Sequence, residues 1–344
     1  MKPNVSAVTA ALLSALLFGV STPFAKFLLM DIGPWLLAGL LYLGAGIGLG
    51  LLSLFSKGPK AKLNKSDWPW LMGAIAAGGV AGPVLLMVGL TGTSGASASL
   101  LLNAEGVFTA LLAWFVFKEN FDRRIAFGMA AIVAGAVVLS WSGSLNIDRL
   151  WPPLAILGAC FCWGVDNNLT RKVSLSDAQQ ITTLKGLIAG TTNTAIALAL
   201  GAKMPGLAPA LSAGIIGFLG YGVSLTLFVV ALRGLGTART GAYFSTAPFV
   251  GAIVAIPLLG EAVTVQLLIA GLLMGFGVWL HLTEVHDHEH THEAMEHAHV
   301  HVHDEHHDHH HDVIPKGPHV HRHRHEPMRH KHPHYPDAHH QHDH

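Results

Sequence analysis

Residues 68–104 read WPWLMGAIAAGGVAGPVLLMVGLTGTSGASASLLLNA, and none of these 37 side chains carries a charge. A helix needs about 20 apolar residues to cross the hydrocarbon core of a bilayer, so this run is long enough for two crossings. The glycines and hydroxyl residues from Gly89 to Gly95 predict a turn between the two helices. Helix is the expected conformation, because unpaired backbone groups in lipid cost several kcal/mol each.

Comparable runs recur up to residue 283, and they predict an all-α integral membrane protein of ten transmembrane helices. The chain is 51% hydrophobic and only 12% charged, whereas soluble domains are about a quarter charged. The uncharged run from Val5 to Ala25 is expected to be a retained helix rather than a cleaved signal peptide. Cys160 and Cys162 indicate neither a disulfide framework nor a thiolate zinc motif. The expected spans are 5–29, 33–55, 68–90, 95–117, 124–142, 151–171, 179–200, 208–232, 239–259 and 263–283.

The positively charged residues of the short loops predict the orientation, because cytoplasmic loops carry an excess of lysine and arginine. With the N-terminus inside, twelve of these residues fall on the cytoplasmic side and three fall outside. An even number of helices then places the C-terminus in the cytoplasm as well. The inside set is Lys2, Lys57, Lys60, Lys62, Lys65, Lys118, Arg123, Arg124, Arg171, Lys172, Arg233 and Arg239, and the outside set is Lys26, Arg149 and Lys203.

The apolar part of the chain repeats itself. Residues 17–26, LFGVSTPFAK, are similar to residues 162–171, CWGVDNNLTR. At an offset of 142, Gly92, Ala96, Ala110, Glu119 and Gly135 fall on Gly234, Ala238, Ala252, Glu261 and Gly277. Two five-helix halves are therefore predicted, 1–142 and 143–284, followed by a tail over 285–344. Because five is odd, the second half should be inverted in the membrane relative to the first.

Each half ends in a Gly- and Ala-rich helix, a short loop bearing Glu119 or Glu261, and a closing helix; residues 245–261 of the second half read STAPFVGAIVAIPLLGE. With these features, residues 5–283 resemble the EamA-type transporters of the drug/metabolite transporter superfamily. The resemblance implies proton- or gradient-coupled movement of small solutes by alternating access, usually export, in a bacterial inner membrane. It does not name the substrate, because the superfamily's substrates include amino acids, sugars, purines and drugs.

Glu105 lies near the middle of the expected fourth span, where a carboxylate is costly and usually faces the bundle interior or a cavity. Its counterpart in the second half is Ala247, beside Pro248, so the carboxylate is not part of the repeat. One interpretation is a proton or cation site, because a buried carboxylate can take up and release a proton. The other is a structural carboxylate held by neighbouring helices.

A second polar group lies in the sixth and seventh spans. Cys162, Asp166 and Thr170 are four residues apart and share a helix face. Lys185 lies at a similar depth and could pair with Asp166. One interpretation is a substrate or coupling-ion site, and the other is a helix-end charge pair with asparagines packed between helices. The candidate transport residues are thus Glu105, Asp166, Asn167, Lys185 and Asn193.

The tail has a different composition from the rest of the chain. All but one of the 25 histidines lie at or after His286, among acidic residues and few large apolar ones, so we expect disorder without a ligand. His-x-His spacing predicts binding of Ni, Co, Zn or Cu ions, with copper favoured in vitro. A pH sensor and a solvating appendage are alternatives, and the mixed pattern is unlike an expression tag. The candidate ligands are His286, His288, His290, His292, His297, His299, His301, His303, His319, His321, His323, His325, His330, His332 and His334.

Three functions are consistent with the sequence: a transporter whose cargo is a metal ion, an exporter of an organic solute whose tail senses or buffers metal, and a membrane anchor for a metal-storing tail. Polar residues inside the spans disfavour the anchor. No nucleophile–base pair or phosphate loop indicates an enzyme, and no cofactor is required. The expected partners are the lipid bilayer and a small solute or metal ion, without nucleic acid; a homodimer is left open.

Overall fold

The structure is a computed structural model that describes residues 5–55, 63–116, 123–141, 147–173, 176–283, 287–292, 295–301, 319–325 and 328–333. Helices account for nearly all of the chain up to residue 282. In order they are α1 Val5–Leu28, α2 Pro34–Phe55, α3 Trp68–Ala74, α4 Gly82–Gly92, α5 Gly95–Leu101, α6 Ala104–Phe115, α7 Arg123–Ser140, α8 Ile147–Val173, α9 Ala178–Ala199, α10 Leu207–Gly217, α11 Ser224–Phe244, α12 Ala247–Leu259 and α13 Val265–Leu282. A 3-10 turn, η1 (Lys65–Asp67), precedes α3.

Helix ends are fixed by local signals that the sequence contains. Ser94, Asp177 and Thr264 each accept a hydrogen bond from the backbone amide three residues later, at the starts of α5, α9 and α13. Gly260 ends α12 in the left-handed conformation, at φ 64°. These residues fix where α5, α9 and α13 begin and where α12 ends.

Eight segments in the described residues are long and apolar enough to cross a membrane. Two other long helices, α8 with 27 residues and α9 with 22, do not meet that hydropathy criterion. They contain the polar residues that the sequence analysis singled out, including Asp166 and Lys185. The multi-pass helical character is therefore shown, whereas the count of ten crossings is not.

The chain reverses its direction within the segment labelled α11. The ring centroids of Phe228 and Phe244 lie 4.9 Å apart, although 16 residues of straight helix would span about 24 Å. The chain must therefore reverse between these residues, as the expected boundary between spans 208–232 and 239–259 requires.

Several expected spans are interrupted. A π-helix, η2 (Ile75–Ala81), separates α3 from α4, and another, η3 (Phe218–Val223), separates α10 from α11. The expected span 95–117 breaks at Leu102–Asn103, between α5 and α6, and the chain breaks again at Ser245–Thr246, before Pro248. Interruptions of both kinds are frequent at functional sites in membrane helices.

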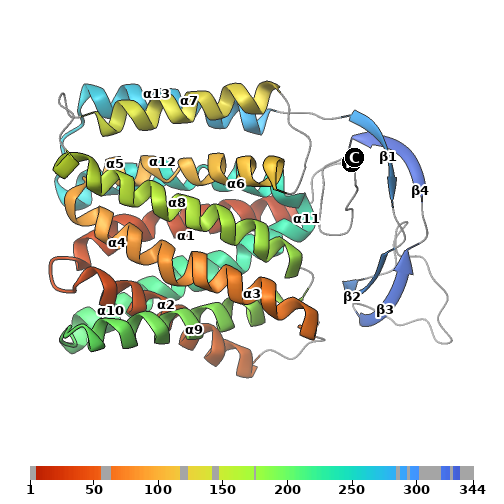
Figure 1. The fold of residues 1–344 in the computed structure, drawn as a ribbon, viewed down its shortest axis with the longest axis horizontal. Helices are drawn as coiled ribbons and strands as arrows, with labels where there is room; N and C mark the ends of the chain where they lie inside the picture. Colours follow the sequence, from red (N-terminus) through yellow and green to blue (C-terminus); the bar gives the residue numbers. More distant parts are fainter. Residues whose placement is uncertain are drawn as a thin grey trace.

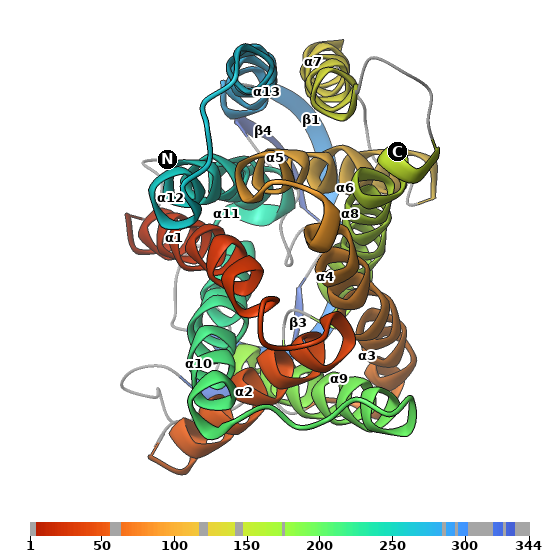
Figure 2. The same ribbon diagram turned by 90° about the vertical axis from the view of Figure 1, so that its left-hand side faces the viewer.

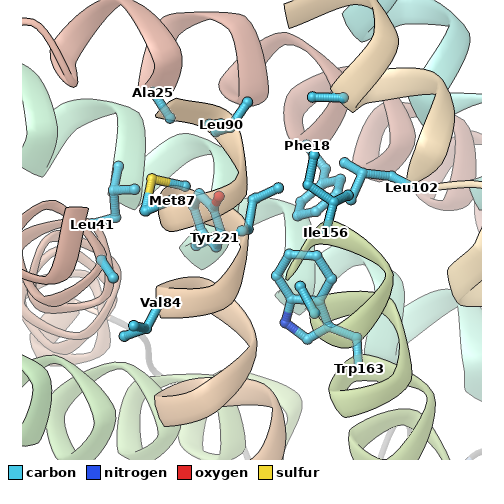
Figure 3. Close-up of a cluster of buried hydrophobic side chains, with 14 of the residues drawn as sticks. Phe18, Ala25, Leu41, Val84, Met87, Leu90, Leu102, Ile156, Trp163 and Tyr221 are labelled. Carbon is cyan, nitrogen blue, oxygen red and sulfur yellow. The ribbon is translucent and has the colours of Figure 1, made fainter. Parts of the chain in front are cut away.

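The helices lie side by side with their axes roughly parallel (Figure 1). Seen along these axes, most of them surround a common centre, while α7 and α13 stand as a pair to one side (Figure 2). Around the centre, buried side chains from different helices pack together, among them Phe18 of α1, Met87 of α4, Trp163 of α8 and Tyr221 of η3 (Figure 3).

Helices α2 and α9 cross in close backbone contact. A Cβ atom added to Gly186 would lie 2.5 Å from the backbone nitrogen of Gly46, and one added to Gly190 would meet the backbone of Leu43. A Cβ on Gly39 would likewise meet Thr194. Small residues permit such approaches, which are typical of helix pairs in membranes.

The described part of the tail contains short paired strands, whereas disorder was expected there. Its backbone forms β1 (Asp287–His292) paired antiparallel with β4 (Met328–Pro333), and β2 (Met295–His301) paired antiparallel with β3 (His319–His325). Alternation of histidine with other residues has the two-residue period of a strand, and this accounts for the difference. His286, His303 and His334 lie outside the described residues.

Candidate functional site

The candidate transport residues gather around α8. Its consecutive residues Asp166 and Asn167 point to different neighbours, because successive side chains of a helix are rotated by about 100°. Asp166 faces α9, and Asn167 faces α6. One turn of α8 thus joins two polar contacts made by different helices.

The first contact is a buried ion pair. Lys185 Nζ lies 2.5 Å from Asp166 Oδ1, and both side chains are about nineteen-twentieths buried, with 5% and 6% of their surface exposed. The Thr170 hydroxyl donates to the same carboxylate oxygen at 2.8 Å and accepts from Lys185 Nζ at 3.0 Å. Buried charges need such partners, because leaving either one alone would cost several kcal/mol.

The second contact joins α8 to α6. Asn167 Nδ2 donates to Glu105 Oε1 at 2.8 Å and to Thr109 Oγ1 at 3.2 Å. Asn168 Nδ2 donates to the carbonyl oxygens of Thr109 at 3.1 Å and Gly164 at 2.9 Å. Glu105 lies in the first turn of α6, directly after the break in the helix, where the helix dipole favours a negative charge.

The π-helix η2 is held by side chains from three other helices. Tyr42 Oη donates to the Gly78 carbonyl at 2.8 Å, and Trp163 Nε1 donates to the same oxygen at 2.9 Å. Asn193 Nδ2 donates to Gly79 O at 3.2 Å. Asn193 therefore binds η2, while the ion pair is formed by other residues. A Cβ on Gly78 would collide with the Asp166 carboxylate, so η2 lies directly against the ion pair.

Aromatic rings continue from this point to the centre of the molecule. The centroid of the Phe18 ring lies 5.8 Å from that of Trp163, which it meets edge-on, and 5.7 Å from that of Tyr221 (Figure 3). The centroid of the Tyr221 ring lies 5.4 Å from that of Tyr42. These aromatic residues are not among the transport residues predicted from the sequence. A signal was present, since Phe18 and Trp163 occupy the same position in the two similar segments, 17–26 and 162–171.

The functional groups of the site are the Asp166–Lys185 ion pair, the Glu105 carboxylate and side-chain amides. Cys160 is buried and Cys162 is half-buried, and both are free thiols. Within the described ranges, no three His, Cys, Asp or Glu side chains come together as ligands for a metal ion. The arrangement brings a buried ion pair, a further carboxylate and two side-chain amides together around α8.

The model of the EamA-like transporter family matches this chain twice, over residues 5–141 and 150–283. The chain belongs to the EamA-like transporter family. Both matches lie in the helical part, and the tail lies beyond them. This EamA protein is therefore a membrane transporter, in a family that is generally not enzymatic.

The chain is also similar to other transporters in sequence and to a solved structure in fold. An "Uncharacterized transporter" of Methanothermobacter thermautotrophicus is 28% identical over 295 residues, covering 80% of this chain and 84% of the relative. A "Probable 4-amino-4-deoxy-L-arabinose-phosphoundecaprenol flippase subunit ArnE" of Pseudomonas fluorescens is 38% identical over 84 residues, 24% of this chain and 71% of that protein. A crystal structure superposes with a TM-score of 0.62 at 17% identity, covering 80% of this chain and 96% of the other, and this likeness shows the fold alone.

Proposed function

We propose that this EamA protein is a secondary transporter that moves a small organic solute by alternating access, with Asp166, Lys185, Asn167 and Glu105 as its central polar site. The buried Lys185–Asp166 pair carries the proposal. Replacing a buried ion pair by packed apolar residues is often neutral or stabilising, so a protein under selection for stability alone has no need of the pair. Ionisable residues inside membrane spans more often serve transport.

The contacts of the pair favour an organic cargo over a metal ion. Asp166 Oδ1 already accepts from Lys185 and Thr170, so a metal ion would have to displace an ammonium group. A solute can instead exchange with the pair, offering a carboxylate to Lys185 or an amine to Asp166. Glu105 accepts a hydrogen bond from the neutral amide of Asn167, and we assign proton coupling to this carboxylate.

An inverted repeat is the architecture we propose for alternating access. The π-helices η2 and η3 occupy corresponding positions at the offset of 142 residues, and so do the breaks at Asn103 and Ser245. A Cβ on Gly78 would meet Asp166, and one on its equivalent Gly220 would meet Ser21, the equivalent of Asp166. This glycine contact is thus common to both halves, and at this position only the second half has a charged residue, Asp166.

The remaining topology follows as part of the same proposal. Helices α8 and α9 pack within the bundle, and their hydropathy is low because they contain the polar site, so we add them to the eight apolar segments, which brings the proposed number of crossings to ten. We place the protein in a bacterial inner membrane with both termini in the cytoplasm.

Proton flux in proteoliposomes tests the function. The purified protein, truncated after Glu284 to remove tail-bound ions, is reconstituted around a pH-sensitive dye and exposed to amino acids, sugars, purines, amines, Ni²⁺, Co²⁺ and Zn²⁺. We expect one class of organic solute to drive proton movement across the vesicle membrane. Asp166→Asn and Lys185→Met should each lower the rate by about tenfold or more, the effect of losing one charge-assisted contact of about 1.4 kcal/mol or more.

Matched variants separate the site from general charge effects. Asp31→Asn and Lys203→Met remove the same charges at exposed positions and should leave the rate unchanged. Glu105→Gln should stop solute-driven proton movement while solute–solute exchange continues. Transport of metal ions alone would replace this proposal with the metal-cargo hypothesis.

We also propose that the tail binds transition metal ions. The strand registers set His297, His299 and His301 opposite His323, His321 and His319, and His288 and His290 opposite His332 and His330. Imidazole ligands repeated in this way provide many sites at high local concentration. The intact protein should bind several equivalents of Ni²⁺ in equilibrium dialysis, and the form truncated after Glu284 should bind none.

A further inference from the structure

The turn between α4 and α5 is held by two charged side chains from distant parts of the chain. Lys26 Nζ, near the end of α1, donates to the carbonyl oxygens of Leu90 at 2.8 Å and Thr93 at 2.7 Å. Glu261 accepts from the backbone amides of Gly95 at 2.5 Å and Ala96 at 2.8 Å. The cation thus caps the carbonyl end of α4 and the carboxylate caps the amide end of α5, as the helix dipoles favour.

The two side chains belong to different halves of the transporter. Lys26 lies in the first family match and Glu261 in the second, immediately after the left-handed Gly260 that ends α12. The fit is close, because a Cβ on Gly95 would lie 2.5 Å from Leu259 and 3.3 Å from the Glu261 carboxylate. The contacts therefore tie the second half to a turn of the first, at the end of the bundle that faces the viewer in Figure 2.

We infer that Lys26 and Glu261 are positioning residues of the transport cycle, forming a latch that keeps this end of the bundle closed. The inference rests on alternating access, in which one half moves against the other and each end opens in turn. Opening this end separates Glu261 from the α5 amides. At the same time the π-helix η2, at the other end of α4, gives the helix a place to bend.

The repeat supplies the matching pair for the opposite end. Arg171 is the equivalent of Lys26 at an offset of 145, and Glu119 is the equivalent of Glu261 at 142. Glu119 lies outside the described residues.

The test measures a distance across the latch, independently of any solute. Spin labels are placed at Thr91→Cys and Val263→Cys, both exposed, in a background with Cys160→Ala and Cys162→Ala, and pulsed electron resonance gives the distance distribution in lipid nanodiscs. We expect one short distance in the parent protein. Glu261→Gln and Lys26→Met should each raise the long-distance population about tenfold or more, since each removes charge-assisted hydrogen bonds.

Control variants make the outcome decisive. Lys26→Arg keeps the cation and Asp31→Asn removes an exposed charge at the same end, so both should retain the short distance. If Glu261→Gln does not yield monodisperse protein, Lys26→Met decides, because it leaves the Glu261 contacts in place. An unchanged distribution in Lys26→Met and Glu261→Gln overturns the latch, whereas failure to find a solute affects only the proposed function.

Discussion

Asp166 and Lys185 are buried together between α8 and α9, so each charge depends on the other for its stability. Thr170 adds a hydroxyl to both partners, and Gly78 of η2 leaves room for the carboxylate. The sequence suggested this pair from the depth of the two residues in their spans. It did not reveal the contact with the η2 backbone or the aromatic side chains of Tyr42 and Trp163 that bind η2, because these contacts form only in the folded molecule.

Removing one partner of the Asp166–Lys185 ion pair should destabilise the protein more than removing both partners. Lys185→Met leaves an unpaired buried carboxylate and should lower the free energy of unfolding by about 3–5 kcal/mol. Adding Asp166→Asn to Lys185→Met should recover most of that loss. Thermal unfolding in detergent compares the three proteins, and a double variant less stable than Lys185→Met would contradict this account.

At the scale of elements, apolar runs predicted where helices lie, since lipid requires every backbone group to be bonded within its own segment. They did not predict where helices are interrupted. The π-helix η2 depends on Tyr42, Trp163 and Asn193, which bind its carbonyl groups from α2, α8 and α9. Such contacts between distant segments have no period in the sequence.

The crossing of α2 and α9 should be sensitive to a single methyl group. Gly186→Ala places a Cβ against the Gly46 backbone and should cost about 1–3 kcal/mol of stability. Gly50→Ala, on α2, the other helix of this pair, meets only the Thr183 methyl at 3.8 Å and should be neutral or slightly stabilising. Equal melting temperatures for the two variants would show that the close approach does not contribute.

For the whole molecule, composition alone separated the helical body from the tail. The family matches end at residue 283, close to the boundary predicted from the histidines. The histidine pattern also has the period of a strand, but a preference for disorder in polar chains concealed it. The cargo is not fixed by composition, because it depends on which side chains meet in the folded molecule.

The helical body should be stable without the tail. The form truncated after Glu284 should unfold within about 2 °C of the intact protein when metal is absent, because the described core is built from residues of the helices. Differential scanning fluorimetry in chelator-treated buffer provides the comparison. A markedly lower melting temperature for the truncated form would mean that the tail supports the body.

The glycine contacts between α2 and α9 have a mechanical consequence. Helices that interlock by ridges and grooves are restricted to a few crossing angles, because rotation would lift each side chain out of its groove. Here the surfaces that touch are backbone, at Gly46 and Gly186 and at Gly190 and Leu43. Fewer side chains interlock here, so under the proposed alternating access we expect the two halves to tilt against each other at this crossing.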